Sequence, residues 1–567
     1  MLGLLEIMNS YNKSEILTNH NDEIMRSPMI GSMMNFQLTI TSIMKHGKTV
    51  NPNKEIISIT SDHKSHRCTL DDIFDRSAKI ANFLKANNIK KGDRIATLAW
   101  NDFRHMELYY GISCYGAVCH TINPRLHPDQ VNFIANDASD KIIFIDVMFI
   151  DLIKAVESEL THVKQFVVLT SDVSVVAHLG EKWTTYEDTL MPFSNNYTWP
   201  ELNENDPCQL CYTSGTTGNP KGVQYSHRAL VLHTMAAIAP DAFSVSKNDC
   251  ILPIVPMFHV NAWGIPYMAA MTGCKLVFAG QKVADPQTLT NLIQNEGVTL
   301  AAGVPTVWNL LAQHLEEKNI KLESLKKLVV GGTAMPPHLY KYFQNEQELA
   351  IIHAWGMTEM SPLGTINHIQ SAEIKHLDDD SFFEQQLKQG APVYGIELKI
   401  INDEGNELDW DGKTPGNLLV RGPWVVDQYF NRADLQCNGE WFDTGDISII
   451  DEHAYMKITD RKKDVIKSGG EWISSVDIEH AMMLHPDVSL AAVIGITHEK
   501  WDERPLLLIE RNVNAELTYN QIKDFLKGRI SNWWMPDAIK YVDKLPLTAT
   551  GKVHKLKIRE TFKDFTF

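Results

Sequence analysis

The chain has 567 residues, of which 44% are hydrophobic and 22% charged, and its formal net charge is −17. This length exceeds that of one ordinary domain, so we expect at least two, and the composition is typical of a globular protein. The negative charge argues against nonspecific binding to nucleic acid or to an anionic membrane.

The N-terminal residues predict neither a secretory signal nor a membrane anchor. Apolar and charged residues alternate there, and no basic segment precedes an uninterrupted apolar run. No run of 18 apolar residues occurs, so at most peripheral contact with a membrane is expected. The eight cysteines are scattered, and the Cys208-x-x-Cys211 pair has no second pair at zinc spacing, which favours buried thiols in a reducing, cytoplasmic compartment. Residues 1–30 form an extension without a readable role.

Helix and strand signals alternate from residue 69 onwards. Thr69 caps a first helix in which Ile80, Phe83 and Leu84 keep helical spacing. Further helices are expected over 109–119, 226–238 and 286–295, and strands over 95–100, 141–146, 166–170, 250–253, 275–278, 300–303 and 328–332. Strands separated by helices predict βαβ units, and hence an α/β fold with largely parallel sheets.

The pattern of predicted secondary structure changes after residue 395. Short strands with turn residues up to 420 predict a small antiparallel, β-barrel-like section, and the last hundred residues predict a small α+β domain. We place the boundaries at 1–30, 31–460 and 461–567, with the last break in a charged stretch that ends before Val465.

Residues 212–223, Tyr-Thr-Ser-Gly-Thr-Thr-Gly-Asn-Pro-Lys-Gly-Val, follow directly on an apolar strand. Turn N–H groups, hydroxyl groups and a lysine can all bind one anion, so this stretch predicts a phosphate-binding loop. It fits neither a Walker A loop nor a Gly-x-Gly-x-x-Gly turn. The alternative is a flexible linker, but linkers rarely follow an apolar strand so closely.

Four other clusters carry groups suited to chemistry: 256–264, 353–359, 441–446 and 548–552. They contribute His259, Trp263, Trp355, Glu359, Asp446 and Lys552. Singly, each has an ordinary interpretation as a satisfied polar residue, a core tryptophan or a solvated charge. Two basic clusters, at 461–467 and 552–559, concentrate positive charge in an acidic chain, and solvated surface is the alternative there.

Together and in this order, the clusters resemble the adenylate-forming (ANL) superfamily of acyl-CoA synthetases, firefly luciferase and peptide-synthetase adenylation domains. The resemblance covers about residues 35–560 and is most specific at 212–223, 441–446 and 460–473. The last of these, with 258–264 and 502–505, is most similar to bacterial medium- and long-chain fatty-acid CoA ligases. Ala354-Trp355 replaces a commoner Gly-Tyr, and tryptophan can still stack on adenine.

The resemblance implies an ATP-dependent ligation of a fatty acid to coenzyme A through an acyl-AMP, with release of AMP and pyrophosphate. A carboxylate that approaches a triphosphate needs cations and fixed donors where charge develops. By this resemblance the phosphates are bound by Thr213, Ser214, Gly215, Thr216, Thr217, Lys221 and Thr358, the adenine by Gly332, Thr333, Ala354, Trp355 and Gly356, and the ribose by Asp446 and Arg461. Glu359 and Thr213 hold Mg²⁺, and Lys552 bridges the carboxylate and the α-phosphate.

One lysine-filled site cannot easily serve both adenylation and attack by a thiol. The resemblance therefore implies that the small domain rotates about Lys463, withdraws Lys552 and presents a CoA-binding segment. This segment comprises Lys467, Ser468, Gly469, Gly470 and Glu471. The acyl pocket is implied to comprise His259, Val260, Trp263, Val330 and Gly331.

Alternatives remain at this point. The acid could be a short sulfur-containing, branched or aromatic carboxylate. The chain could be a nucleotide-binding regulator that has lost catalysis, although Lys221, Glu359, Asp446 and Lys552 argue against that. A peptide-synthetase adenylation module would adjoin a carrier domain. Similarity to long-chain relatives suggests a homodimer.

Overall fold

The computed structural model of the protein describes residues 32–61, 65–213, 219–367, 374, 376–437, 440–469, 471–512, 517–548 and 552–567. The chain divides into two compact units, Met1–Phe36 and Gln37–Phe567. Every helix and strand that the structure describes lies in the second unit. Of the site residues predicted above, Ser214, Gly215, Thr216, Thr217 and Gly470 lie outside the described residues.

The first large sheet has seven strands in the order β7-β6-β5-β3-β4-β8-β9. Its strands are β3 (Arg94–Leu98), β4 (Val118–Thr121), β5 (Ile142–Ile145), β6 (Gln165–Val168), β7 (Trp183–Thr185), β8 (Pro207–Thr213) and β9 (Lys221–Ser226). All neighbours are parallel except β8 and β9, which are antiparallel. These strands are buried on both faces, which explains why their sequences are continuously apolar.

The second large sheet has nine strands in the order β16-β15-β14-β13-β12-β10-β11-β1-β2. They are β1 (Glu55–Ile59), β2 (Ser65–Thr69), β10 (Cys250–Pro253), β11 (Lys275–Phe278), β12 (Leu300–Gly303), β13 (Lys327–Val330), β14 (Ala350–Gly356), β15 (Leu363–Asn367) and β16 (Ala391–Pro392). Pairing is parallel from β14 to β1 and antiparallel at both edges. The predicted α/β class with largely parallel sheets is confirmed.

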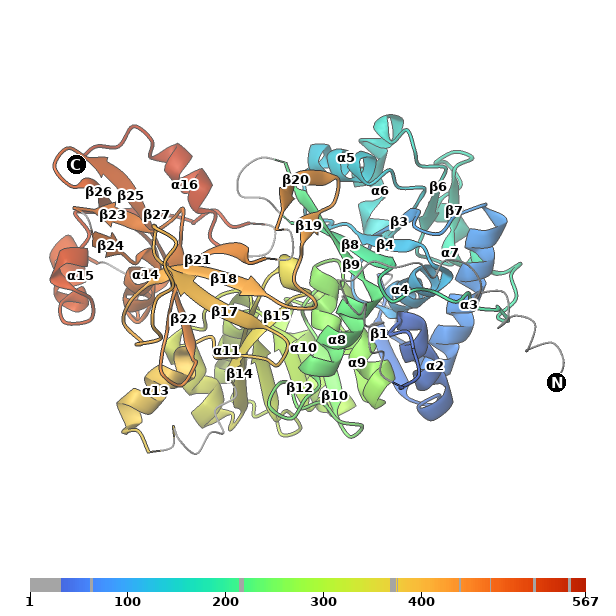
Figure 1. The fold of residues 1–567 in the computed structure, drawn as a ribbon, viewed down its shortest axis with the longest axis horizontal. Coiled ribbons are helices and arrows are strands. Elements are labelled where there is room, and N and C mark those ends of the chain that lie inside the picture. The colour runs from blue at the N-terminus through green and yellow to red at the C-terminus, as the bar shows by residue number, and fades with distance from the viewer. Residues whose placement is uncertain are drawn as a thin grey trace, which may run out of the picture. The chain divides into compact units, whose positions relative to one another are not determined.

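Helices cover both faces of the two large sheets (Figure 1). They are α2 (Ile40–Val50), α3 (Leu70–Ala86), α4 (Phe103–Tyr115), α5 (Pro128–Asp137), α6 (Ile150–Lys154), α7 (Tyr186–Leu190), α8 (His227–Ala237), α9 (Ile265–Thr272), α10 (Pro286–Glu296), α11 (Pro305–Lys318), α12 (Pro337–Lys341) and α13 (Asp379–Leu387). The largest core joins one face of each sheet through α2, α3, α4, α8 and α9. Helices α10 and α11 cover the other face of the nine-stranded sheet, and α5 and α6 that of the seven-stranded sheet.

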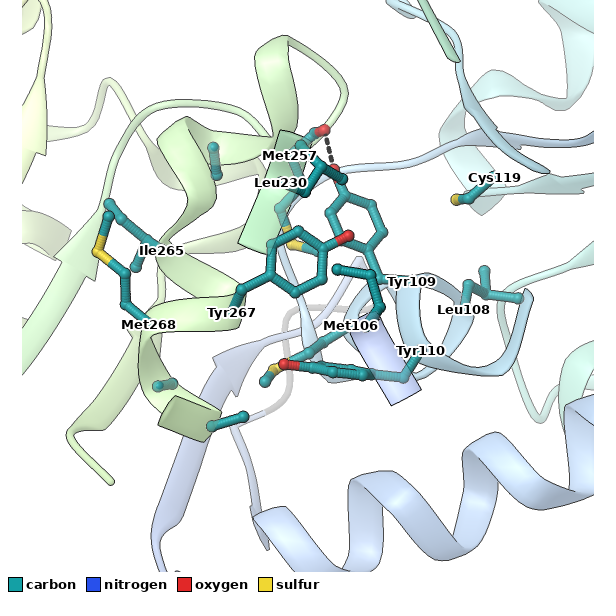
Figure 2. Packing of buried hydrophobic residues seen from close by; sticks show 14 of the residues in the cluster. Met106, Leu108, Tyr109, Tyr110, Cys119, Leu230, Met257, Ile265, Tyr267 and Met268 are labelled. Atoms are coloured by element: carbon teal, nitrogen blue, oxygen red, sulfur yellow. Dashed lines mark hydrogen bonds between the residues drawn. The ribbon is translucent and has the colours of Figure 1, made fainter. Parts of the chain in front are cut away.

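Aromatic side chains hold the centre of this shared core. Tyr109 and Tyr110 of α4 and Tyr267 of α9 are fully buried and lie close together (Figure 2). The Tyr109 hydroxyl donates to the Met257 carbonyl, and the Tyr110 hydroxyl donates to the Pro266 carbonyl at 3.0 Å. These bonds satisfy buried hydroxyls and connect α4 with the segment around α9, next to the predicted acyl pocket.

Three smaller sheets follow. The antiparallel sheet β17-β18-β21-β22 comprises β17 (Glu397–Ile401), β18 (Gly416–Arg421), β21 (Phe442–Ile450) and β22 (Met456–Arg461), and β19 (Gln428–Tyr429) pairs with β20 (Arg432–Gln436) in a separate hairpin. The last sheet has the order β24-β23-β26-β25, with β27 beside β26. It comprises β23 (Ile466–Ser468), β24 (Glu471–Ile473), β25 (Val488–His498), β26 (Asp502–Arg511) and β27 (Ala538–Val542), with helices α14 (Ser475–Met483), α15 (Tyr519–Leu526) and α16 (Lys555–Thr561). The predicted antiparallel section and small α+β part are confirmed.

One predicted helix is wrong in its bounds. The expected helix over 109–119 begins earlier, at Phe103, and ends at Tyr115, after which Gly116 takes a φ of 98°. Val118 to Thr121 is instead strand β4. A glycine with a left-handed backbone conformation ends the helix and starts the turn into the strand. Within the described ranges, no helix is long and apolar enough to span a membrane.

Candidate active site

The two ends of the predicted phosphate loop are fixed side by side. Thr213 ends β8 and Lys221 begins β9, and the two are paired across the antiparallel ladder. The Tyr212 hydroxyl donates to the Asp137 carboxylate at 2.6 Å. The backbone N–H of Phe430 donates to the Gly222 carbonyl at 2.8 Å. Both flanks of the loop are therefore held by neighbouring elements.

The ends of β13 and β14 bring the predicted adenine-binding residues together. Val330 ends β13 and is followed by Gly331, Gly332 and Thr333, while Ala354, Trp355 and Gly356 end β14. These strands are parallel neighbours, so their carboxyl ends share one edge of the sheet, where α/β folds bind ligands. Gly332 has a φ of 83°, which favours glycine at this bend.

Glu359 is a buried carboxylate just beyond that edge. It lies in a short 3₁₀ turn, Thr358–Met360, and only 8% of its surface is exposed. The Tyr429 hydroxyl donates to Glu359 Oε1 at 2.8 Å, and the Tyr225 hydroxyl donates to the Thr358 carbonyl at 2.7 Å. Burial raises the pKa of Glu359, whereas the Tyr429 hydrogen bond and the charges of Arg461 and Lys221 lower it.

The donor set around Glu359 fits a hard cation that a nucleotide brings with it. Among the described residues, no group of three or more His, Cys, Asp or Glu side chains could form a metal cage. One carboxylate with a hydroxyl residue, Thr213, suits Mg²⁺, which usually keeps phosphate oxygens and water as its other ligands.

Asp446 joins three elements. Its carboxylate contacts Arg461 Nε at 2.7 Å and accepts a hydrogen bond from Trp355 Nε1 at 3.2 Å. β-Strand pairing places Asp446 opposite Arg461 on β21 and β22. Burial raises the pKa of Asp446, and Arg461, Trp355 and Lys552 lower it by favouring the carboxylate. Trp355 is thereby oriented by the residue predicted to bind the ribose.

Lys552 reaches this site from the far end of the chain. Burial and the positive charge of Arg461 lower its pKa to about 8, and the negative charge of Asp446 opposes this shift. Burial and the positive charge of Lys552 lower the pKa of His259 to about 4. The charges of Arg461 and Asp446 thus act on Lys552, and the charge of Lys552 acts on His259.

The predicted acyl-pocket residues form a left-handed turn against a glycine. Val260, Asn261, Ala262 and Trp263 all have positive φ, between 45° and 56°. A Cβ atom added to Gly331 would lie 2.8 Å from the Trp263 ring. The indole therefore lies against Gly331, and successive left-handed residues store strain that a functional site often carries.

The predicted hinge, Lys463, lies between residues whose hydrogen bonds lead to different parts of the chain. On one side, the Lys462 N–H donates to the Gly445 carbonyl at 2.9 Å, within the β21–β22 region. On the other, Asp464 Oδ1 accepts from Arg559 of α16 at 2.6 Å. Lys463 lies between these two bonds, in a turn where the N–H groups of Asp464 and Val465 donate to the Arg461 carbonyl at 2.8 Å. A rotation of the residues after Lys463 could be absorbed in this turn.

The predicted CoA segment lies on the edge of the last sheet. Lys467 and Ser468 belong to β23, Gly469 follows with a φ of 60°, and Glu471 begins β24. The buried guanidinium of Arg504 donates to Ser468 Oγ at 3.1 Å. This bond fixes Ser468 to β26 of the same sheet.

The comparisons with known proteins decide the family. The profile of AMP-binding enzymes matches residues 45–430, and that of the C-terminal domain of AMP-binding enzymes matches 477–552. The chain belongs to the AMP-binding enzyme family. This agrees with the predicted adenylate-forming superfamily, which is confirmed.

Three similar proteins span nearly the whole chain. The 3-methylmercaptopropionyl-CoA ligase of Ruegeria lacuscaerulensis is 44% identical and covers 94% of this chain and 99% of its own. The medium-chain-fatty-acid–CoA ligase of Ectopseudomonas oleovorans is 43% identical, with 94% and 98% covered. The crystal structure of the anthranilate CoA ligase AuaEII with anthranoyl-AMP has a TM-score of 0.82 at 22% identity, covers 93% of this chain and 98% of its own, and supports the fold. The predicted enzyme class, an AMP-forming acid–thiol ligase, is confirmed.

Sequence reasoning missed the tyrosines of this AMP-binding enzyme. Three tyrosine hydroxyl groups donate hydrogen bonds near the site: that of Tyr212 to Asp137, that of Tyr225 to the Thr358 carbonyl and that of Tyr429 to Glu359. Each lies outside the chemical motifs except Tyr212, and no spacing in the chain connects Tyr429 with a residue 70 positions earlier. The hairpin that carries Tyr429, Gln428–Gln436, contains one asparagine and no glycine, so its composition gives no signal either.

Proposed function

We propose that this CoA ligase of the AMP-binding family activates a fatty acid of medium or long chain. The acid and ATP form an acyl-AMP and pyrophosphate, and the CoA thiol then displaces AMP. The observation that carries the proposal is the buried Asp446, which contacts Arg461 Nε at 2.7 Å and Trp355 Nε1 at 3.2 Å and whose pKa the charge of Lys552 also lowers, although these residues come from distant parts of the chain.

The arrangement supports adenylation on electrostatic grounds. An anionic carboxylate must approach the α-phosphate of an anionic triphosphate. Lys552 and Arg461 supply positive charge on one side, and Lys221 supplies it beside the phosphate loop. Because their repulsion lowers the pKa of Lys552, bound anions stabilise its charged form where charge develops. Bound Mg²⁺ would add charge compensation at the phosphates, and Glu359 with Thr213 would hold it.

The nucleotide orientation follows from the same residues. Trp355, on β14, is proposed to stack on the adenine, with Gly332 and Thr333 after the neighbouring strand β13 and with Ala354 and Gly356 beside it. Asp446, fixed by Trp355 and Arg461, is placed to accept hydrogen bonds from ribose hydroxyl groups. Thr358 lies beside Glu359 and is proposed to contact the α-phosphate.

The proposed rotation of the last domain between the two half-reactions is supported by the hydrogen bonds on either side of Lys463. The residues after Lys463 are proposed to turn as one body, because Asp464 is bound to α16, while Lys462 stays bound to Gly445. In the second step Lys467, Ser468, Gly469, Gly470 and Glu471 would face the acyl-AMP and CoA.

An apolar acid is supported by the residues at the acyl pocket. Val260, Trp263, Val330 and Gly331 offer no charge to a second polar group on the acid, and His259 is held neutral at pH 7 by its low pKa. The medium-chain relative agrees with this choice. The second candidate is a short sulfur-containing acid, favoured by the relative that acts on 3-methylmercaptopropionate, since a thioether is equally uncharged.

An acid panel tests the substrate. Pyrophosphate exchange and CoA-dependent AMP release are measured with even-numbered fatty acids from six to eighteen carbons, 3-methylmercaptopropionate and benzoate. We expect the highest kcat/KM with a straight-chain acid of six or more carbons. A preference for 3-methylmercaptopropionate establishes the second candidate, and a preference for benzoate refutes both. The Lys221→Met and Asp446→Asn variants are the controls for exchange that does not come from this site.

A further inference from the structure

Tyr429 contacts two groups of opposite charge that the proposed function assigns to one polyphosphate. Its hydroxyl donates to Glu359 Oε1 at 2.8 Å, and the ammonium of Lys221 lies 5.0 Å from the centre of its ring. One side chain therefore touches the lysine of the phosphate loop and the carboxylate proposed to bind a metal.

The position of Tyr429 does not depend on a ligand. The next residue, Phe430, is hydrogen-bonded through its N–H to the Gly222 carbonyl, and its ring lies 5.8 Å from the Arg94 guanidinium. The Asn431 side chain donates to the Asp137 carbonyl at 3.1 Å. Asp137 also accepts from Tyr212, so both flanks of the phosphate loop and the hairpin that carries Tyr429 share one set of anchors.

This placement has an electrostatic consequence. The described ion pairs do not join Lys221 and Glu359, and Tyr429 contacts both of them. A direct Lys221–Glu359 pair would neutralise both groups and compete with phosphate and metal. The ring face attracts the ammonium without cancelling its charge, and the hydroxyl leaves the carboxylate ionised.

We propose that Tyr429 is a positioning residue that keeps Lys221 and Glu359 apart and oriented for a metal-bound polyphosphate. This inference rests on the proposed function, because it assumes that a nucleotide binds here. It assigns two separable tasks to one side chain: the hydroxyl serves the metal carboxylate, and the ring serves the lysine.

Two substitutions separate the two tasks. Tyr429→Phe keeps the ring beside Lys221 and removes the donor to Glu359. Tyr429→Leu removes both contacts and lets Lys221 reach the carboxylate. Tyr394→Phe is the matched control, because it deletes a hydroxyl from a tyrosine that is 99% exposed.

The readout is ATP binding by titration calorimetry, without acid or CoA, in Mg²⁺ and in EDTA. For Tyr429→Phe we expect the gain in affinity that Mg²⁺ gives to shrink by about tenfold, the worth of one hydrogen bond to a charged group, with unchanged affinity in EDTA. For Tyr429→Leu we expect a loss in both conditions. The Tyr394→Phe variant keeps the wild-type values.

The outcomes are distinct. Wild-type affinity of Tyr429→Phe in Mg²⁺, or an equal loss of its affinity in Mg²⁺ and EDTA, overturns the role of the hydroxyl. Wild-type affinity of Tyr429→Leu in EDTA overturns the role of the ring. If the wild-type protein binds no ATP, the proposed function falls and this inference falls with it.

Discussion

The charge state of Lys552 gives the sharpest test of the site. Burial and Arg461 lower its pKa from an ordinary value of 10.5 to about 8. This shift means that the ligand-free site disfavours the ammonium by about 3 kcal/mol relative to water. The lysine is then roughly nine-tenths charged at pH 7 and one-tenth charged at pH 9.

The proposed role of Lys552 in adenylation requires its positive charge. The rate of acyl-AMP formation should therefore fall as the pH rises through the pKa of Lys552. We expect kcat/KM for acyl-AMP formation to fall by about tenfold per pH unit above pH 8, because that constant reports groups of the free enzyme. In the second half-reaction the lysine is withdrawn. The rate at which supplied acyl-AMP and CoA form the thioester should therefore not show this alkaline limb, the fall in rate above pH 8.

The Lys552→Arg variant is the decisive comparison. A guanidinium stays charged throughout the accessible range, so the alkaline limb should vanish even where the absolute rate is lower. Lys552→Ala should abolish acyl-AMP formation and spare thioester formation. The same alkaline limb in the arginine variant, or equal loss of both half-reactions in the alanine variant, would refute the assignment of Lys552 to the first step.

Three more substitutions test the rest of the site. Trp355→Phe keeps an aromatic face but removes the N–H bonded to Asp446, so the KM for ATP should rise by about tenfold in steady-state assays at saturating acid. Gly331→Ala places a methyl group 2.8 Å from the Trp263 ring, and the acid panel should show the optimum shifted to shorter acids; an unshifted optimum places the acyl chain elsewhere. Lys463→Pro fixes one backbone torsion between the ties of Lys462 and Asp464, so thioester formation should slow by at least about tenfold while pyrophosphate exchange persists.

Much of the fold could be predicted because its local signals agree with its tertiary structure. Thr69 forms the expected cap: its hydroxyl accepts from the Asp72 N–H, and the Asp72 carboxylate accepts from the Thr69 N–H. Strands β10, β11 and β12 have the predicted bounds, because short apolar stretches buried on both faces are recognisable as strands. The helix over 103–115 was harder to bound, since a helix and the following strand form one apolar stretch that only Gly116 divides.

The site could be predicted only in part, for two physical reasons. Residues near strand ends, such as Thr213 on β8 and Trp355 on β14, fall in recognisable stretches because each follows an apolar strand that the sequence reveals. The left-handed turn at 260–263 has no sequence signal: Val260 and Ala262 rarely adopt positive φ, and the surrounding packing imposes it. Contacts such as that between Tyr429 and Lys221 join positions 208 residues apart, and depend on how the hairpin is docked.

The electrostatics of the site connect its two proposed steps. In a chain of net charge −17, burial and repulsion by Arg461 lower the pKa of Lys552, and Asp446, which is paired with Arg461, opposes this shift. A bound triphosphate and carboxylate compensate this repulsion and favour the arrangement seen here. Once pyrophosphate leaves, much of the compensating negative charge is gone, while the repulsion between the two cations remains. We therefore expect departure of pyrophosphate itself to favour withdrawal of Lys552, so that the order of the two half-reactions follows from the charges of the site.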